Sequence, residues 1–142
     1  MQAQKSVRRA PYLSETLLKY GFLAILGGVG YYTIEVFYRG YSHISMAICG
    51  AVCMCAIYNI NDPKRKMPFP MRILLGTVII TAVEFIAGCI LNLWLGLRVW
   101  DYSNLPYNLF GQICLGFIIL WMLLNVPLSL LCYAIRKNIF GE

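Results

Sequence analysis

The chain has 142 residues, of which 60% are hydrophobic and 13% are charged, and its net charge is +6. This length allows one domain, and a charged content far below the roughly one quarter of an average soluble domain excludes a soluble globular protein. The lysines and arginines stand beside long apolar runs, where a membrane surface explains them better than nucleic acid does, so we expect no nucleic-acid partner.

The apolar runs predict an all-α, polytopic membrane protein with four transmembrane helices, at about residues 17–38, 44–60, 71–97 and 109–135. We treat residues 1–142 as a single transmembrane domain in the lipid bilayer. The basic residues before the first helix lack the cleavage site of a signal peptide, and Ser14 is expected to cap that helix. Pro127 should kink the fourth helix, because it removes one backbone hydrogen bond.

The first helix carries signs of close packing and of an ion pair. Gly27, Gly28 and Gly30 are small enough to let a neighbouring helix approach closely in lipid. Glu35 and Arg39 stand four residues apart near its far end, a spacing that favours a salt bridge on one helix face.

The third helix carries a polar stripe along one face, made of Thr77, Thr81, Glu84, Gly88 and Asn92. The spacings of three and four residues bring these positions onto the same side of a helix. An ionisable residue on such a stripe should point into the bundle rather than toward lipid. Glu84 therefore needs a proton or a partner, and Arg39, Arg98 and His43 are the candidate partners on that side.

Charge counting predicts the orientation. With the N-terminus inside, the inner side carries Lys5, Arg8, Arg9, Lys19, Lys64, Arg65, Lys66, Arg72, Arg136 and Lys137. The outer side carries only Arg39 and Arg98. An excess of lysine and arginine marks the cytoplasmic side, so we expect both termini to be cytoplasmic.

An offset of 61 residues overlays Tyr41-Ser42 on Tyr102-Ser103 and the Gly50–Cys53 segment on the Gly111–Cys114 segment. Both predicted hairpins cross the membrane in the same sense. A duplication would therefore be a parallel 2+2 repeat of helical hairpins, about an axis along the membrane normal. The match covers few residues, so true duplication and chance stay open.

Most of the unusual polar residues share the outer half of the membrane. The candidate site for a solute or an ion comprises Glu35, Arg39, His43, Glu84, Asn92, Asp101, Tyr102, Ser103, Asn108 and Gln112. An interfacial belt is a competing explanation for aromatic residues in the outer loop, and capping of the fourth helix is one for Asn108. The carboxylate of Glu84 lies nearest the bilayer centre and is the most telling member.

No catalytic signature is complete. A phosphate-binding loop is absent, so this chain cannot hydrolyse ATP on its own. Met46, Cys49 and Cys53 share a helical face and could hold a soft metal, but packing explains them as well, so we expect no metal and no cofactor. A general acid such as Glu84 with His43 as base is a nonspecific pairing, which leaves an enzyme less favoured than a transporter.

Several segments together resemble a family of small bacterial membrane proteins, the putative ABC-transporter type IV permeases. They are Glu35–Gly40, His43–Met46, Ile80–Gly88, Trp100–Ser103 and Gly111–Cys114, within about residues 28–121. The resemblance implies a helical fold, the bacterial cytoplasmic membrane and a separate ATPase as partner. The segment Leu131–Arg136 lacks an acidic residue that we expect before the final arginine in relatives.

The leading hypothesis is a permease-like translocation component whose site opens outward, with Glu84 as the proton- or cation-binding carboxylate. Because four helices are few for an alternating-access path, it implies a homodimer or a partner membrane subunit. The alternatives are a membrane-embedded enzyme acting on a lipid or isoprenoid, and an accessory subunit whose outer face docks a partner. The sequence does not choose a substrate.

Overall fold

The computed structural model describes residues 9–142, and side chains from Tyr12 onward. Within this part the chain is all-α apart from one very short hairpin. The elements are α2 (Arg9–Arg39), α3 (Ile44–Ile60), the 3-10 turn η1 (Pro63–Arg65), α4 (Phe69–Gly88), the π-helix η2 (Cys89–Trp94), β1 (Asn108–Leu109), β2 (Ile113–Cys114) and α5 (Leu115–Asn138). The predicted charges at Lys5 and Arg8 lie outside the described residues.

In the part of the chain that the structure describes, three helical stretches are long and apolar enough to cross a membrane, namely Tyr12–Arg39, Phe69–Trp94 and Leu115–Asn138. The shorter apolar helix α3 has 17 residues and matches its predicted bounds. The first helix begins well before the predicted cap, so Ser14 lies inside α2 and the capping prediction is wrong. The third ends in η2 at Trp94, short of the predicted residue 97.

The fourth helix differs most from its prediction. It begins at Leu115 rather than near Asn108, because β1 and β2 pair antiparallel across residues that were expected to be helical. Tyr107, Phe110 and Gly111 have positive φ angles, which a helix cannot contain and which turn the chain back on itself. Pro127 lies within α5, and the helix continues through it without a break.

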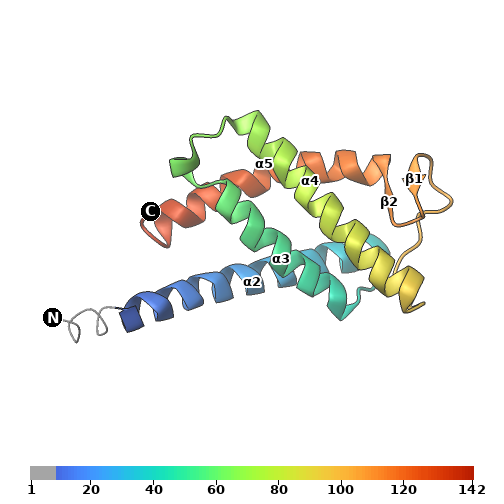
Figure 1. Ribbon diagram of the computed structural model, residues 1–142, viewed down its shortest axis with the longest axis horizontal. Helices are drawn as coiled ribbons and strands as arrows, with labels where there is room; N and C mark the ends of the chain where they lie inside the picture. Colours follow the sequence, from blue (N-terminus) through green and yellow to red (C-terminus); the bar gives the residue numbers. More distant parts are fainter. Residues whose placement is uncertain (1–8) are drawn as a thin grey trace.

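Figure 1 shows how the elements are arranged along the helix axes. The first turns of α2, the η1 turn and the end of α5 lie at one end of the molecule. The turn between α2 and α3, the end of α4 and the β1–β2 hairpin lie at the other. We refer to these as the inner end and the outer end, after the predicted orientation.

Glycines bring α2 and α3 into close contact, as predicted from their small size. A side chain at Gly50 would meet the carbonyl oxygen of Gly27 at 2.5 Å and Cβ of Tyr31 at 2.5 Å. Gly28 lies against the backbone of Ala47 in the same way, whereas the space beside Gly30 is open. The two helices therefore form the tightest pair in the molecule.

Polar side chains join α4 to α5 and close the inner end. Asn125, fully buried on α5, donates hydrogen bonds to the carbonyl oxygen of Trp121 at 2.8 Å and to Oγ1 of Thr77 at 3.4 Å. At the inner end, the buried guanidinium of Arg136 donates to the carbonyl oxygen of Tyr58 and pairs with Glu142. The hydrogen bond from Arg136 to Tyr58 therefore links α5 to α3 at the inner end.

The 61-residue offset does not correspond to a structural repeat at the aligned residues. Gly50 and Cys53 lie inside α3, whereas Gly111 belongs to the turn of the hairpin and Cys114 ends β2. The aligned glycines also differ in backbone conformation, since Gly111 has a φ of +70° and Gly50 is helical. The aligned segments therefore differ in local structure, and the possible repeat finds no support at these residues.

Candidate functional site

Glu84 is buried in α4, with 5% of its surface exposed, and its carboxylate is bound by two aromatic donors. The indole Nε1 of Trp121 donates to Oε2 at 2.8 Å, and the hydroxyl of Tyr102 lies 3.0 Å from Oε1. The prediction that Arg39, Arg98 or His43 would pair with Glu84 is wrong within residues 12–142. Of these three residues, Arg39 instead donates hydrogen bonds to Glu35 and to the carbonyl oxygen of Val99.

Stacked rings hold the two donors in place. Tyr102 stacks on Phe117 with ring centroids 4.6 Å apart and planes 10° from parallel. Phe117 in turn contacts Trp121, and Tyr31 of α2 lies 5.9 Å from Trp121 between ring centroids. The outer loop, α5 and α2 therefore meet at the Glu84 carboxylate through aromatic packing.

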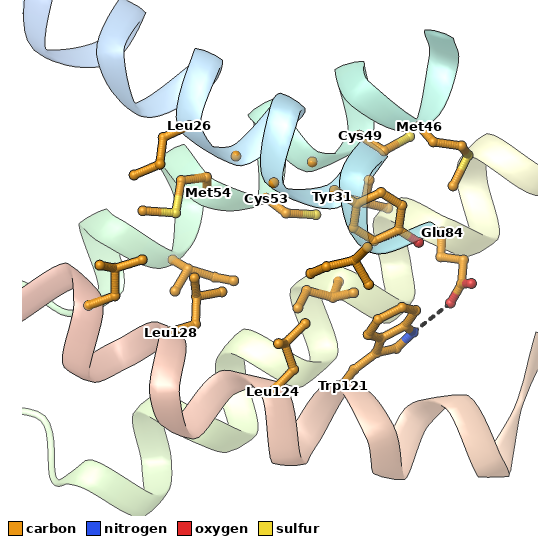
Figure 2. Close-up of a pocket in the computed structure, with 18 of the residues that line it drawn as sticks. Leu26, Tyr31, Met46, Cys49, Cys53, Met54, Glu84, Trp121, Leu124 and Leu128 are labelled. Atoms are coloured by element: carbon orange, nitrogen blue, oxygen red, sulfur yellow. Dashed lines mark hydrogen bonds between the residues drawn. The ribbon is translucent and has the colours of Figure 1, made fainter. Parts of the chain in front are cut away.

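Beside Glu84 lies a cavity of about 310 Å³, within the range of roughly 300–1,000 Å³ that is typical of small-molecule sites. Most of its lining is aliphatic, aromatic or sulfur-containing, and Glu84 is the charged residue among the lining side chains. Figure 2 shows the lining side chains and labels Leu26, Tyr31, Met46, Cys49, Cys53, Met54, Glu84, Trp121, Leu124 and Leu128. We call this space the cavity.

The cavity opens sideways, between α2 and α5. Its lining includes Ile34 of α2 and Pro127 and Leu131 of α5, all of which are exposed on the surface of the molecule. Helix α2 packs mainly along α3, so large side chains rather than close helix packing bridge α2 and α5.

Glu35 and Arg39 form the predicted ion pair, with Nη2 and Oε1 3.0 Å apart, which confirms that prediction. The other oxygen of Glu35 accepts a hydrogen bond from Ser42, and Nη1 of Arg39 donates to the carbonyl oxygen of Val99 at 2.8 Å. The pair therefore joins the end of α2 to the outer loop. It lies near the site but does not line the cavity.

Asn92 and Gln112 form a second hydrogen-bonded group. Together with Val99, Trp100 and Arg39, they make up what we call the outer-loop lock. Nδ2 of Asn92 donates to Oε1 of Gln112 at 2.8 Å, and Oδ1 of Asn92 accepts from the backbone N–H of Val99 at 2.7 Å. The indole of Trp100 donates to the carbonyl oxygen of Gln112. Asn92 lies in the π-helix η2, an irregularity that is frequent at functional sites.

Asp101, Ser103 and Asn108 shape the loop that carries Tyr102. All three are exposed. The side chain of Asp101 accepts from the backbone N–H of Ser103, and hydrogen bonds from the side chain and backbone of Ser103 lower the pKa of Asp101. Asn108 donates to the carbonyl oxygen of Leu105 and accepts from Gly111, so it stabilises the hairpin rather than capping α5. Asp101 does not share the cavity with Glu84.

His43 caps α3, where its ring nitrogen Nδ1 accepts a hydrogen bond from the backbone N–H of Ser45. The imidazole is exposed and does not line the cavity. Of the ten predicted site residues, the structure brings together Glu84 with Tyr102, Asn92 with Gln112, Glu35 with Arg39, and Asp101 with Ser103. Among them, Glu84 is the one that lines the cavity.

The sequence reasoning missed Trp121 and Tyr31 as site residues, and it noted the shared face of Cys49 and Cys53 but assigned both cysteines to packing. Their apolar character made them look like ordinary packing residues. The available signal was Trp121, because a tryptophan inside an apolar span needs an acceptor for its N–H, and Glu84 is the nearest acidic residue in the neighbouring span.

Comparison with known proteins supports the resemblance predicted from the sequence. The family model described as "Putative ABC-transporter type IV" matches residues 12–141, which is nearly the whole chain. No curated protein and no solved structure matches.

Proposed function

This chain belongs to the putative ABC-transporter type IV family, and on that premise we propose that it is the permease-like membrane component of a transport system, with the cavity as its solute site. The observation that carries the proposal is a ligand-sized cavity whose lining reaches the surface at Ile34, Pro127 and Leu131 and includes one buried carboxylate, Glu84. In a bilayer, this opening would face the lipid chains. A carboxylate at such a depth is costly, which favours a functional role over simple packing.

We further propose four membrane crossings within a single transmembrane domain, with both termini cytoplasmic. The antiparallel course of α3 between α2 and α4 supports the fourth crossing, since its two ends lie at opposite ends of the molecule (Figure 1). Its 17 residues reach roughly 26 Å at 1.5 Å per residue, close to the hydrocarbon thickness. Lys64, Arg65 and Lys66 at the inner end favour the cytoplasmic side.

Within the proposed site, Glu84 would contact the solute directly, and Tyr102, which donates to Glu84 but does not line the cavity, would act by positioning that carboxylate. Glu35 and Arg39 lie near the outer end of the cavity and would shape its electrostatics. The other proposed residues, His43, Asn92, Asp101, Ser103, Asn108 and Gln112, would act by holding the outer loop in position, because their hydrogen bonds go to the loop and its neighbours.

Four helices do not enclose a path across the bilayer, so the proposal includes a second copy or a partner membrane subunit. The described helices present many exposed apolar side chains that lipid or a partner would cover. The family description, together with the absence of a phosphate-binding loop in the sequence, favours a separate ATPase as the source of energy. We propose the bacterial cytoplasmic membrane as the location.

Two glycines of α2 provide the test. Gly30 lines the cavity, and a Cβ atom added there would have no other atom within 4 Å, whereas Gly21 has equally open surroundings but does not line the cavity. Cells that express the wild type, Gly30→Leu, Gly21→Leu or Glu84→Gln are compared for accumulation of a panel of cationic, neutral and anionic amphiphilic dyes. We expect expression to change the accumulation of some dyes, with the change lost in Gly30→Leu and Glu84→Gln and kept in Gly21→Leu.

The opposite result would overturn the proposal. If cells lacking the chain accumulate every dye as the wild type does, or if Gly30→Leu leaves a transport effect intact, the cavity is not a solute site. Membrane extraction followed by a quantitative blot for each variant shows that the compared cells contain equal amounts of the protein.

A further inference from the structure

The cavity is elongated and has two unlike ends. On α2 its lining extends from Leu26 to Ile34, and on α5 from Trp121 to Leu131, which corresponds to roughly 12 and 15 Å along the helix axes. Figure 2 shows Tyr31, Glu84 and Trp121 at one end and Leu26 and Leu128 toward the other. A ligand that fits this shape has a polar head and a linear apolar tail.

The polar end carries an acidic group without a basic partner. Within residues 12–142 no lysine, arginine or histidine lines the cavity, and the ion pairs involve Glu35, Asp62 and Glu142 instead of Glu84. The hydrogen-bond partners of Glu84, the hydroxyl of Tyr102 and the indole of Trp121, are both neutral. They leave the negative charge of an ionised carboxylate without a counter-charge within residues 12–142.

Aromatic rings flank the same carboxylate. Tyr31 and Trp121 both line the cavity next to Glu84, with ring centroids 5.9 Å apart. The faces of such rings attract cations, most strongly where water is excluded. A carboxylate and two aromatic rings at one end of an apolar space form a set of groups that complements a positive charge and disfavours a negative one.

Resting on the proposed solute site, we propose that the cavity binds an amphiphile with one cationic headgroup, an alkylammonium, whose head lies against Glu84 and whose tail extends toward Leu26 and Leu128. The headgroup supplies the counter-charge that the carboxylate lacks. The tail replaces lipid contacts with the aliphatic lining. The sideways opening between α2 and α5 gives such a ligand a route from the lipid.

Two native cysteines report occupancy. Cys49 and Cys53 line the cavity, whereas Cys55 and Cys89 do not, and all four are free thiols that are partly exposed. Purified protein in neutral-lipid vesicles is treated with N-ethylmaleimide in the presence of decyltrimethylammonium, decanol or decyl sulfate. These probes share one tail and differ in head charge. Mass spectrometry then gives the rate of modification at each cysteine.

We expect decyltrimethylammonium to protect Cys49 and Cys53, but not Cys55 and Cys89, at a concentration at least about tenfold lower than decanol requires. In Glu84→Gln the two concentrations should become equal. Glutamine can still accept from the indole of Trp121 and donate to the oxygen of Tyr102, so this variant should keep the fold. Glu84→Asp, which keeps the charge, should retain a preference for the cation.

Two outcomes separate the inference from the function on which it rests. If decanol or decyl sulfate protects the wild type as well as the ammonium does, the cation proposal is wrong and the solute site stands. If no probe protects Cys49 or Cys53 at any concentration, no such ligand enters the cavity, and both proposals fail. Cys55 and Cys89 must react equally in every variant, which also verifies that the variants are folded alike.

Discussion

The outer-loop lock and the cavity beneath it differ in the partners that their polar side chains have. In the lock, the polar side chains of Asn92 and Gln112 bind each other and the loop backbone. In the cavity, a single carboxylate stands among apolar side chains with aromatic donors as its partners. The difference teaches that polar residues which satisfy one another form a structural network, whereas an isolated carboxylate in an apolar space is the group on which the proposed ligand site rests.

Breaking the lock should have the largest effect on stability. Asn92→Leu removes the acceptor of the Val99 N–H and the donor to Gln112, leaving both groups without partners in a partly buried place. Each such group costs about 1–3 kcal/mol, so the free energy of unfolding should fall by about 3 kcal/mol. Unfolding in mixed detergent micelles measures it. Leu93→Ala, at an exposed neighbour in η2, is the control and should cost much less.

A smaller loss is expected from Gly88→Ala, which tests whether the lock depends on close approach to α4. The added methyl group would lie 2.6 Å from Oε1 of Gln112 and 3.0 Å from Cζ2 of Trp100, so the loop must shift. Overpacking of this kind costs about 1–3 kcal/mol. Gly116→Ala adds the same methyl group to α5 in open space. Equal stability of the two variants would contradict a close-packed lock.

The sequence predicted the helical part of the fold well and the outer loop poorly. Apolar runs located the helices, because hydrophobic length is a strong local signal, and α3 matches its prediction. The hairpin before α5 was missed because it depends on positive φ angles at Tyr107 and Phe110, which non-glycine residues rarely adopt and which their side chains do not reveal.

For the candidate site, the sequence identified Glu84 from its depth in an apolar span but gave it the wrong partners. Charge alone offered Arg39, Arg98 and His43 as partners, whereas Arg39 pairs with Glu35, as their spacing predicted, and donates to the carbonyl oxygen of Val99. Which partner an ionisable group finds depends on helix rotation and loop path, and neither is encoded in local spacing. The cavity itself arises from the packing of four helices, so no single segment could predict it.

Removing the hydrogen bond from Tyr102 to Glu84 should lower stability moderately and leave the outer-loop lock intact. Tyr102→Phe keeps the stacking on Phe117 and deletes the hydroxyl that lies 3.0 Å from Glu84. The free energy of unfolding should fall by about 1 kcal/mol. In a double-mutant cycle with Glu84→Gln, the two changes should be coupled, whereas Tyr102→Phe and Asn92→Leu should be close to additive. Additivity of the first pair would show that the hydrogen bond contributes nothing.

Acid should produce the smallest effect, and it should be confined to the exposed part of the outer loop. The pKa of Asp101 lies below its ordinary value of 3.8, because the side chain and backbone of Ser103 donate hydrogen bonds to the carboxylate. A lowered pKa in the folded state means that this contribution is present above pH 3.8 and is lost as pH falls through the folded value. The Ser103 amide should therefore lose protection from hydrogen exchange as the pH falls through the folded-state pKa of Asp101.

The lock should stay closed over the same pH range, because its acceptors are amide and carbonyl oxygens that do not titrate. The Val99 amide, bound to Asn92, therefore serves as the internal reference for the Ser103 amide. In Asp101→Asn the side chain can still accept the hydrogen bond in a form that carries no charge, so Ser103 protection should become independent of pH. Parallel loss of protection at Val99 and Ser103 would mean that the loop and the lock open together, and that the Asp101 turn is one of the contacts that keep Tyr102 against Glu84.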